Sequence, residues 1–166
     1  MVCSRFFWPA AVLVLLTAQA GCKRQPAPVS QPMALSHQRH MKADMKCITC
    51  HPGGEDQAQA QFPTLADCMD CHHKPRGAEP DEPKVRWYAE HEQEIPWIRV
   101  DRLPGHVYFS HAPHVTLAKM ACESCHQGIA ERTRPLSLPD VQPTMEECMR
   151  CHRERGASNE CRTCHK

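Results

Sequence analysis

The chain has few of the residues that build an ordinary protein core. Aromatic residues make up 5% of its 166 positions, whereas proline occurs 15 times. No long apolar run follows residue 16, so no later segment is predicted to cross a membrane. Its few basic residues show no aromatic interleaving and no recognition motif, which argues against a nucleic-acid partner. A polypeptide core of normal size cannot form from this composition.

Cysteine and histidine, in contrast, are abundant, with 12 of each. The pattern Cys-x-x-Cys-His occurs five times, at residues 47–51, 68–72, 122–126, 148–152 and 161–165. The thiols of these motifs are Cys47, Cys50, Cys68, Cys71, Cys122, Cys125, Cys148, Cys151, Cys161 and Cys164. The histidines that end them are His51, His72, His126, His152 and His165. Residues three and four apart on a helical turn share one face, so both sulfurs and the imidazole can reach one group.

Each motif has the chemistry that attaches one haem c. Two thiols form thioether bonds to the vinyl groups, and the imidazole takes an axial position on the iron. A disulfide scaffold or four-cysteine zinc sites would also use paired cysteines, but neither requires histidine as the next residue. A thioredoxin-like site would occur once, in a βαβ context. We therefore expect five covalently bound haem c groups, which form the core and make folding depend on haem.

The amino terminus has the features of an export signal, which we place at residues 1–21. An apolar stretch follows a weakly basic start and is too short, and interrupted by Pro9, for a permanent membrane helix, although an uncleaved anchor stays an alternative. Residues 18–20 fit ordinary signal peptidase, and residues 20–22 fit a bacterial lipoprotein signal. We favour a lipid on Cys22, because no haem motif uses this cysteine. The expected location is the periplasmic face of the cytoplasmic membrane, with a soluble periplasmic or outer-membrane protein as alternatives.

The haem groups also change the charge of the protein. Residues 1–21 carry one charged side chain, Arg5, so the formal charge of +1 for the full chain falls to zero in the mature polypeptide. Two propionates on each of five haems add about ten negative charges. The haem-loaded protein is therefore expected to be acidic at neutral pH.

Two parts of the sequence resemble each other in the same order. Residues 35–40 are similar to residues 109–114, and residues 63–72 match residues 143–152. We read a duplicated three-haem unit whose first copy has lost one haem. The predicted division is a tether at 22–34, a two-haem repeat at 35–74, a linker at 75–106 and a three-haem repeat at 107–166.

The predicted fold is mainly irregular, with short α-helices, a haem-stack core and little or no sheet. Thr144 with Glu147 forms a capping-box pattern, and Thr64 with Asp67 a weaker one, so helices are expected to begin there. Another short helix is expected at about 85–93. Two segments are candidates for short strands: 97–100 and 107–109.

Histidines outside the motifs are candidates for the second axial position on each iron. Two His-x-x-His elements directly precede haem motifs, and they supply His37, His40, His111 and His114. One of His73, His91 and His106 is expected to complete the set for the fifth iron. Methionine is the alternative ligand, and the nearest candidates are Met41, Met45 and Met120, which we interpret as packing residues.

The His-x-x-His elements and serial haem motifs resemble the class III multihaem cytochromes c. Residues 97–100, 103–111 and 145–165 more closely resemble the pentahaem and hexahaem cytochrome subunits of alternative complex III and quinone reductase complexes. This resemblance covers about 40% of the chain and implies a multihaem cytochrome c fold.

The resemblance also implies a set of distal ligands. It assigns His37 and His111 to the first haem of their own copies, and His114 to the haem at Cys164. His40 is then released to another iron, for which the haem at Cys151 is a candidate. No histidine lies between residues 126 and 148, so the ligand of the haem at 148–152 stays open.

Three functions are compatible with these features. The leading one is an electron-transfer subunit of a membrane menaquinol oxidoreductase complex, with a quinone-reactive membrane subunit and iron-sulfur, molybdopterin-like or other cytochrome subunits as partners. The second is a lipid-anchored or soluble periplasmic electron shuttle. The third, a haem-based reductase, needs an open iron, and the abundance of candidate ligands and the absence of a motif ending in lysine argue against it. We expect no catalytic residues.

Apolar side chains of the linker are candidates for a partner-facing patch or for cover over the haems: Trp87, Tyr88, Ile95, Trp97 and Ile98.

Overall fold

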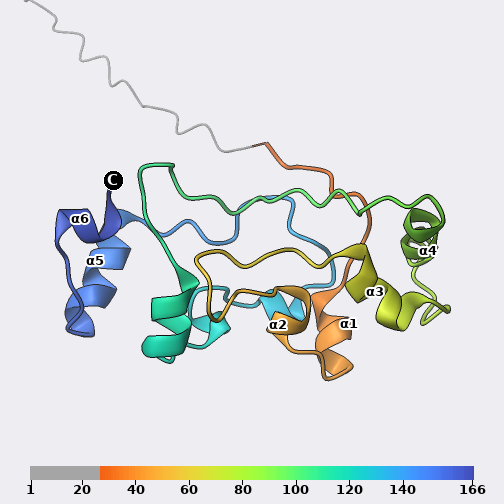
Figure 1. Cartoon of the computed structure of the whole chain (residues 1–166), viewed down its shortest axis with the longest axis horizontal. Helices are drawn as coiled ribbons and strands as arrows, with labels where there is room; N and C mark the ends of the chain where they lie inside the picture. Colours follow the sequence, from red (N-terminus) through yellow and green to blue (C-terminus); the bar gives the residue numbers. More distant parts are fainter. Residues whose placement is uncertain (1–26) are drawn as a thin grey trace, which may run out of the picture.

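A computed structural model describes residues 27–166 as an elongated body of short helices joined by long connections (Figure 1). The predicted export signal at residues 1–21 and the candidate lipid site Cys22 lie outside the described residues. The elements in chain order are α1 (His37–Lys42), α2 (Cys47–Cys50), α3 (Leu65–His72), α4 (Pro83–Glu90), the π-helix η1 (Pro113–Leu117), the 3₁₀-helices η2 (Cys122–Ser124) and η3 (Ile129–Glu131), α5 (Met145–Glu154) and α6 (Cys161–Cys164). Helices α3 and α4 lie at one end of the long axis, and α5 and α6 lie at the other (Figure 1).

Residues 27–166 contain no β-strand, which confirms the prediction of a mainly irregular fold with short helices. The two candidate strands are single extended segments, and only Val107 forms a bridge, antiparallel to His165. Within the same residues, no helix is long and apolar enough to cross a bilayer.

The predicted helix starts at Thr64 and Thr144 are confirmed as complete capping boxes. Each threonine hydroxyl accepts a hydrogen bond from the backbone N–H three residues later. In return, the carboxylates of Asp67 and Glu147 each accept the threonine N–H at 2.7 Å. These bonds satisfy donors that a helix start leaves free, so α3 and α5 begin at equivalent points of the two copies.

Helix α4 differs slightly from the expected helix at 85–93. It begins two residues earlier because Pro83 occupies its first turn, where a missing N–H costs nothing. It ends at Glu90, and Glu92 then adopts a positive φ of 51°. The left-handed residue turns the chain into the long connection that runs back along the body (Figure 1).

One small cluster contains all the buried hydrophobic side chains of the described residues. Met33, Val85 and Ile95 are 7%, 4% and 7% exposed. The half-buried side chains around them are Leu65, Cys68, Met69, Tyr88 and Trp97. Three buried apolar residues are far too few to stabilise 140 residues, so the rest of the fold depends on another apolar component.

The two predicted copies contact each other reciprocally. The N–H of Gln38 in α1 donates to the carbonyl of Arg132 at 3.0 Å, and the N–H of Ala112 donates to that of Gln57 at 3.1 Å. Gln38 and Ala112 occupy equivalent positions in the two His-x-x-His elements. Each element therefore docks on the loop that follows the first Cys-x-x-Cys-His motif of the other copy.

Candidate haem sites

All five Cys-x-x-Cys-His motifs form helical turns. In the motifs at 47–51, 122–126 and 161–165, the histidine N–H donates to the carbonyl of the first cysteine at 2.9 Å. The other two motifs lie within α3 and α5. This local geometry brings two sulfurs and an imidazole to one side of each turn, as thioether attachment of a haem requires.

Four motif histidines lie opposite a second imidazole from elsewhere in the chain. The pairs, with the separations of their ring centroids, are His37–His51 (6.5 Å), His40–His72 (6.2 Å), His114–His152 (6.1 Å) and His106–His165 (5.6 Å). An iron bonded at about 2 Å to a nitrogen of each ring holds the two centroids about 6 Å apart. The residues present therefore fit a haem iron between two histidines.

The fifth motif histidine, His126, lies near His111. The pKa of His126 is below its usual value, mainly because the ring is buried, and the neighbouring His111 and His51 lower it further. Asp101 and Asp140 act in the opposite direction. The structure thus brings each motif histidine close to a different histidine outside the motifs.

Hydrogen bonds at Nδ1 orient most of these imidazoles. Five rings donate from Nδ1 to a backbone carbonyl: His40 to Ser36 at 2.8 Å, His51 to Gln61 at 3.0 Å, His111 to Ala58 at 3.0 Å, His114 to Ser110 at 2.7 Å and His152 to Ser158 at 2.6 Å. Because a carbonyl can only accept, the proton is on Nδ1 and the lone pair is on Nε2. That tautomer is the one that ligates a metal through Nε2.

The comparisons with known proteins agree with this geometry. Residues 107–166 match the family described as cytochrome c7 and related cytochrome c. The menaquinone reductase, multiheme cytochrome c subunit of Nitratidesulfovibrio vulgaris strain Hildenborough is 30% identical over 161 residues, which covers 82% of this chain and 77% of the relative. The chain belongs to the multihaem cytochromes c. Its family is related to the cytochromes of quinone reductase complexes, and it is an electron-transfer protein that carries covalently bound haem c.

Of the three histidines considered for the last position in this cytochrome, the structure favours His106. The backbone beside it pairs with the C-terminus, where Tyr108 N–H donates to the Cys164 carbonyl at 2.7 Å and Lys166 N–H donates to the His106 carbonyl at 3.1 Å. His91 instead stacks on Trp87 with centroids 4.1 Å apart.

Three other residues weighed as ligands, His73, Met41 and Met45, have different surroundings. His73 follows α3, is exposed, and donates from Nδ1 to the Met69 carbonyl at 3.3 Å. Met41 and Met45 line a surface hollow together with Cys47 and Cys122. These two methionines therefore lie near motif cysteines, which agrees with their interpretation as packing residues.

The ring pairs differ from the ligand assignment that the resemblance implied. His114 lies beside His152, not beside His165, and His40 lies beside His72 of its own copy. His114 is therefore the candidate for the open position opposite His152. The symmetry of the duplicated elements was the signal for this pattern, because the second histidine of each element lies beside the second motif of the same copy.

Cysteine neighbours show the order in which the motifs of the cytochrome follow one another in space. Burial raises the pKa of the Cys68 thiol to about 11, and the nearby Cys50 contributes. Burial likewise raises the pKa of Cys122, Cys125 and Cys148, with smaller contributions from Cys47, Cys151 and Cys164 respectively. These sulfurs become thioethers when haem is attached, so the thiol pKa values no longer apply. What remains useful is which cysteines of different motifs are neighbours. They join the motifs in the order 68–72, 47–51, 122–126, 148–152 and 161–165.

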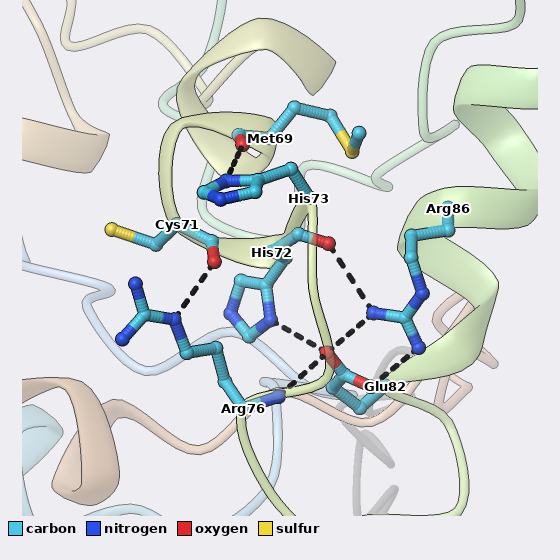
Figure 2. Close-up of polar contacts among 7 residues, drawn as sticks. All are labelled: Met69, Cys71, His72, His73, Arg76, Glu82 and Arg86. Atoms are coloured by element: carbon cyan, nitrogen blue, oxygen red, sulfur yellow. Dashed lines mark hydrogen bonds and ion pairs between the residues drawn. The ribbon is translucent and has the colours of Figure 1, made fainter.

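One motif histidine has a carboxylate partner. Figure 2 shows His72 Nδ1 donating to Glu82 Oε1 at 2.9 Å, while Arg86 donates to both carboxylate oxygens at 2.7 and 2.9 Å. Arg86 also donates to the His72 carbonyl at 3.2 Å, and the Arg76 N–H donates to Glu82 at 3.3 Å. Glu82 is 8% exposed. Chiefly because of Arg86, and then of His72, its pKa is lowered to about 2.

Sequence reasoning missed Glu82. It lies ten residues after His72 in a linker without haem motifs, and one acidic residue among several there carries no distinguishing pattern. The i,i+4 spacing of Glu82 and Arg86 on a helix was the available signal, although such pairs are common on helix surfaces.

Proposed function

We propose that this protein is a pentahaem periplasmic cytochrome that conducts electrons as a subunit of a membrane menaquinol oxidoreductase complex. The observation that carries the proposal is the presence of a separate imidazole for every motif histidine. Haem c supplies a one-electron iron couple when it is bound. The ten motif cysteines hold five such groups, and the ligand pairs are His51 with His37, His72 with His40, His126 with His111, His152 with His114 and His165 with His106.

Two ligands on every iron are what an electron carrier needs. Paired imidazoles would hold each iron from two histidines, which would leave no position for a substrate and would keep the ligand set constant in both oxidation states. Nδ1 bonds to the backbone fix five of the ten rings and limit the rearrangement that electron transfer requires. The same arrangement gives lower potentials than methionine ligation, in a range suited to menaquinol chemistry.

A single line of haems is supported by the cysteine proximities. The haem of the 68–72 motif stands at one end, and that of the 161–165 motif stands at the other. The first motifs of the two copies meet in the middle, where Cys47 and Cys122 are neighbours and His51 lies near His126. Electrons that enter at the α3–α4 end would leave at the α6 end, or the reverse.

Membership of a complex is supported by the relative, whose name makes it a subunit of a menaquinone reductase. For this chain we infer a quinone-reactive membrane subunit as partner, together with iron-sulfur, molybdopterin-like or other cytochrome subunits. The inferred anchor is a lipid on Cys22, which holds the protein at the periplasmic face of the cytoplasmic membrane. Of the five linker side chains considered for a partner surface, Trp87 and Ile98 are exposed at 47% and 40%, whereas Ile95 is buried.

Mass spectrometry and mild extraction test the proposal together. Protein matured with a cytochrome c system is expected to carry five haem additions and, if Cys22 is the anchor, a lipid on an N-terminal cysteine. Detergent extraction is expected to recover a salt-resistant complex with a quinone-reactive subunit. Four haems or fewer would contradict the haem count. Quantitative release as a monomer by salt would contradict membership of a complex and support a freestanding shuttle.

A further inference from the structure

Six imidazoles of the proposed ligand set donate a hydrogen bond from Nδ1 to an acceptor within the described residues. Only one of these six acceptors is charged. Five accept through backbone carbonyls, whereas His72 donates to the Glu82 carboxylate at 2.9 Å (Figure 2). Glu82 comes from the linker, outside both repeats. The difference is therefore specific to the haem at 68–72, which the cysteine contacts place at one end of the line.

We propose that Glu82 is a positioning residue that lowers the reduction potential of the haem held by His72 and His40, making it the most reducing haem of the chain. This inference rests on the proposed function, because it assumes that His72 ligates a haem iron. The inference also gives electron transfer a direction, since an electron on this terminal haem would move to the haem at 47–51, which has a higher potential.

A carboxylate changes an axial imidazole more than a carbonyl does. It attracts the Nδ1 proton more strongly, so Nε2 becomes a stronger electron donor to the metal. A stronger donor stabilises the oxidised iron more than the reduced iron, which lowers the potential. Hydrogen bonding to an axial ligand is one of the main ways in which a protein tunes a haem.

The surroundings of Glu82 hold its carboxylate in this position. Arg86 binds both oxygens, so the carboxylate cannot rotate away from His72 without breaking an ion pair. The Arg76 N–H reaches the same oxygen as His72, and Arg86 also binds the His72 carbonyl. The contacts link the end of α3 to the start of α4, and so tie the ring orientation of His72 to a helix that carries no haem motif.

Arg86 opposes the charge of Glu82, so the experiment must separate the hydrogen bond from net charge. The cationic guanidinium raises the potential of a nearby haem, whereas the carboxylate lowers it. Replacing Glu82 by glutamine keeps the shape and a neutral acceptor but leaves Arg86 unpaired. Replacing both Glu82 and Arg86 by glutamine keeps the net charge of the wild type and removes the charged acceptor, together with the contacts that Arg86 makes with Glu82 and the His72 carbonyl.

The test is a redox titration of the five-haem protein by visible and EPR spectroscopy. Glu82→Gln is expected to move one of the five components upward by about tenfold in its reduction equilibrium, which is about 59 mV for one electron. Arg86→Gln is expected to move the same component downward. The double variant is expected to stay above the wild type. The matched control is Glu90→Gln, which removes an exposed carboxylate from the same helix and is expected to leave that component within a few-fold of wild type.

Two outcomes would contradict the inference. If Glu82→Gln leaves all five components unchanged, or if the double variant returns to the wild-type potential, the charged acceptor does not tune this haem. If Glu82→Gln does not fold, Arg86→Gln still tests the inference through its opposite sign. A haem count below five in the wild-type protein contradicts the proposed function separately, because the count does not depend on the potential.

Discussion

In the first copy, at 35–74, α1 is a regular helix, whereas the equivalent element of the second copy becomes the π-helix η1. The two elements differ in their cap. Ser36 caps α1 by accepting the Arg39 N–H at 3.3 Å, and the residue equivalent to Arg39 is Pro113, which has no N–H to donate. Ser110 donates instead to the Gln57 carbonyl of the other copy at 3.4 Å. Even so, the second histidine of each element keeps the same Nδ1 bond, to the carbonyl four residues earlier.

The two copies differ more at the place where the second one holds its third motif. After α5, the chain reaches α6 and His165, which stacks with His106 at 5.6 Å. After α3, the chain instead forms α4, whose Val85 packs with Met33 and Ile95. The first copy is therefore followed by a small cluster of tether and linker side chains, whereas the second copy continues into a candidate haem site. The comparison indicates that a haem and a few apolar residues can serve the same structural purpose, because each removes apolar surface from water.

Removing all haems is expected to have the largest effect on both copies. Expressed without cytochrome c maturation, the chain is expected to lack a cooperative thermal transition, because Met33, Val85 and Ile95 are the buried apolar residues that remain in the described part. Circular dichroism and limited proteolysis check this. Protein matured with haem serves as the control. A cooperative transition in the haem-free chain, or a protected fragment around α3 and α4, would contradict it.

The pairing of ligands within each copy is tested next. His114→Ala is expected to produce a high-spin EPR signal, because one iron loses its second imidazole. Adding Cys148→Ala and Cys151→Ala, which removes the haem at 148–152, is expected to abolish that signal. Adding Cys161→Ala and Cys164→Ala instead is expected to leave it. The opposite result would restore the pairing of His114 with His165 that the family resemblance implied.

Features that depend on residues close together in the sequence could be predicted from it. The helix starts at Thr64 and Thr144 were predictable because a capping box depends on residues three positions apart. The haem-binding turns were predictable because the Cys-x-x-Cys-His motif contains all the groups that attach a haem. The irregular fold followed from the scarcity of aromatic residues and the 15 prolines.

Features that depend on contacts between distant segments were less accessible. His106 could not be chosen over His73 and His91 without the pairing of its backbone with the C-terminus. Glu82 could not be found because its contact with His72 requires α3 and α4 to meet. The exposure of Trp87 and burial of Ile95 likewise depend on how the linker folds back over α3.

A substitution in the small core sharpens the contrast between the copies. Met33→Ala is expected to lower the free energy of unfolding by about 2 kcal/mol, the low end for a buried methionine, because 7% of the side chain stays exposed. Denaturant titration followed by haem absorbance measures the change. Met145→Ala is the control, since Met145 is 57% exposed and its loss is expected to change stability by less than about 0.5 kcal/mol. Equal effects of the two substitutions would show that the cluster does not stabilise the first copy.

The smallest expected effect tests whether α3 and α5 are equivalent. Thr64→Ala and Thr144→Ala are each expected to cost about 1 kcal/mol, because each removes an N-cap hydrogen bond, whereas serine at either position retains it. A clearly larger loss in one copy, measured by denaturant titration, would contradict equivalence.

Measuring the same variants at lower pH extends this last test. Hydrogen bonds with Thr144 lower the pKa of Glu147, so the contribution of this carboxylate to stability is present above its unfolded pKa and is lost as pH falls through its lower native pKa. Asp67 follows the same rule, since its pKa is lowered by Thr64. The difference between wild type and each alanine variant is therefore expected to shrink on acidification, in both copies alike. The bond from the backbone N–H to the carboxylate survives in both alanine variants and cancels in this difference. A difference that stays constant down to the native pKa would therefore show that the threonine side chain does not act through the ionised carboxylate, and that its hydroxyl stabilises these helix starts only as an acceptor for the backbone.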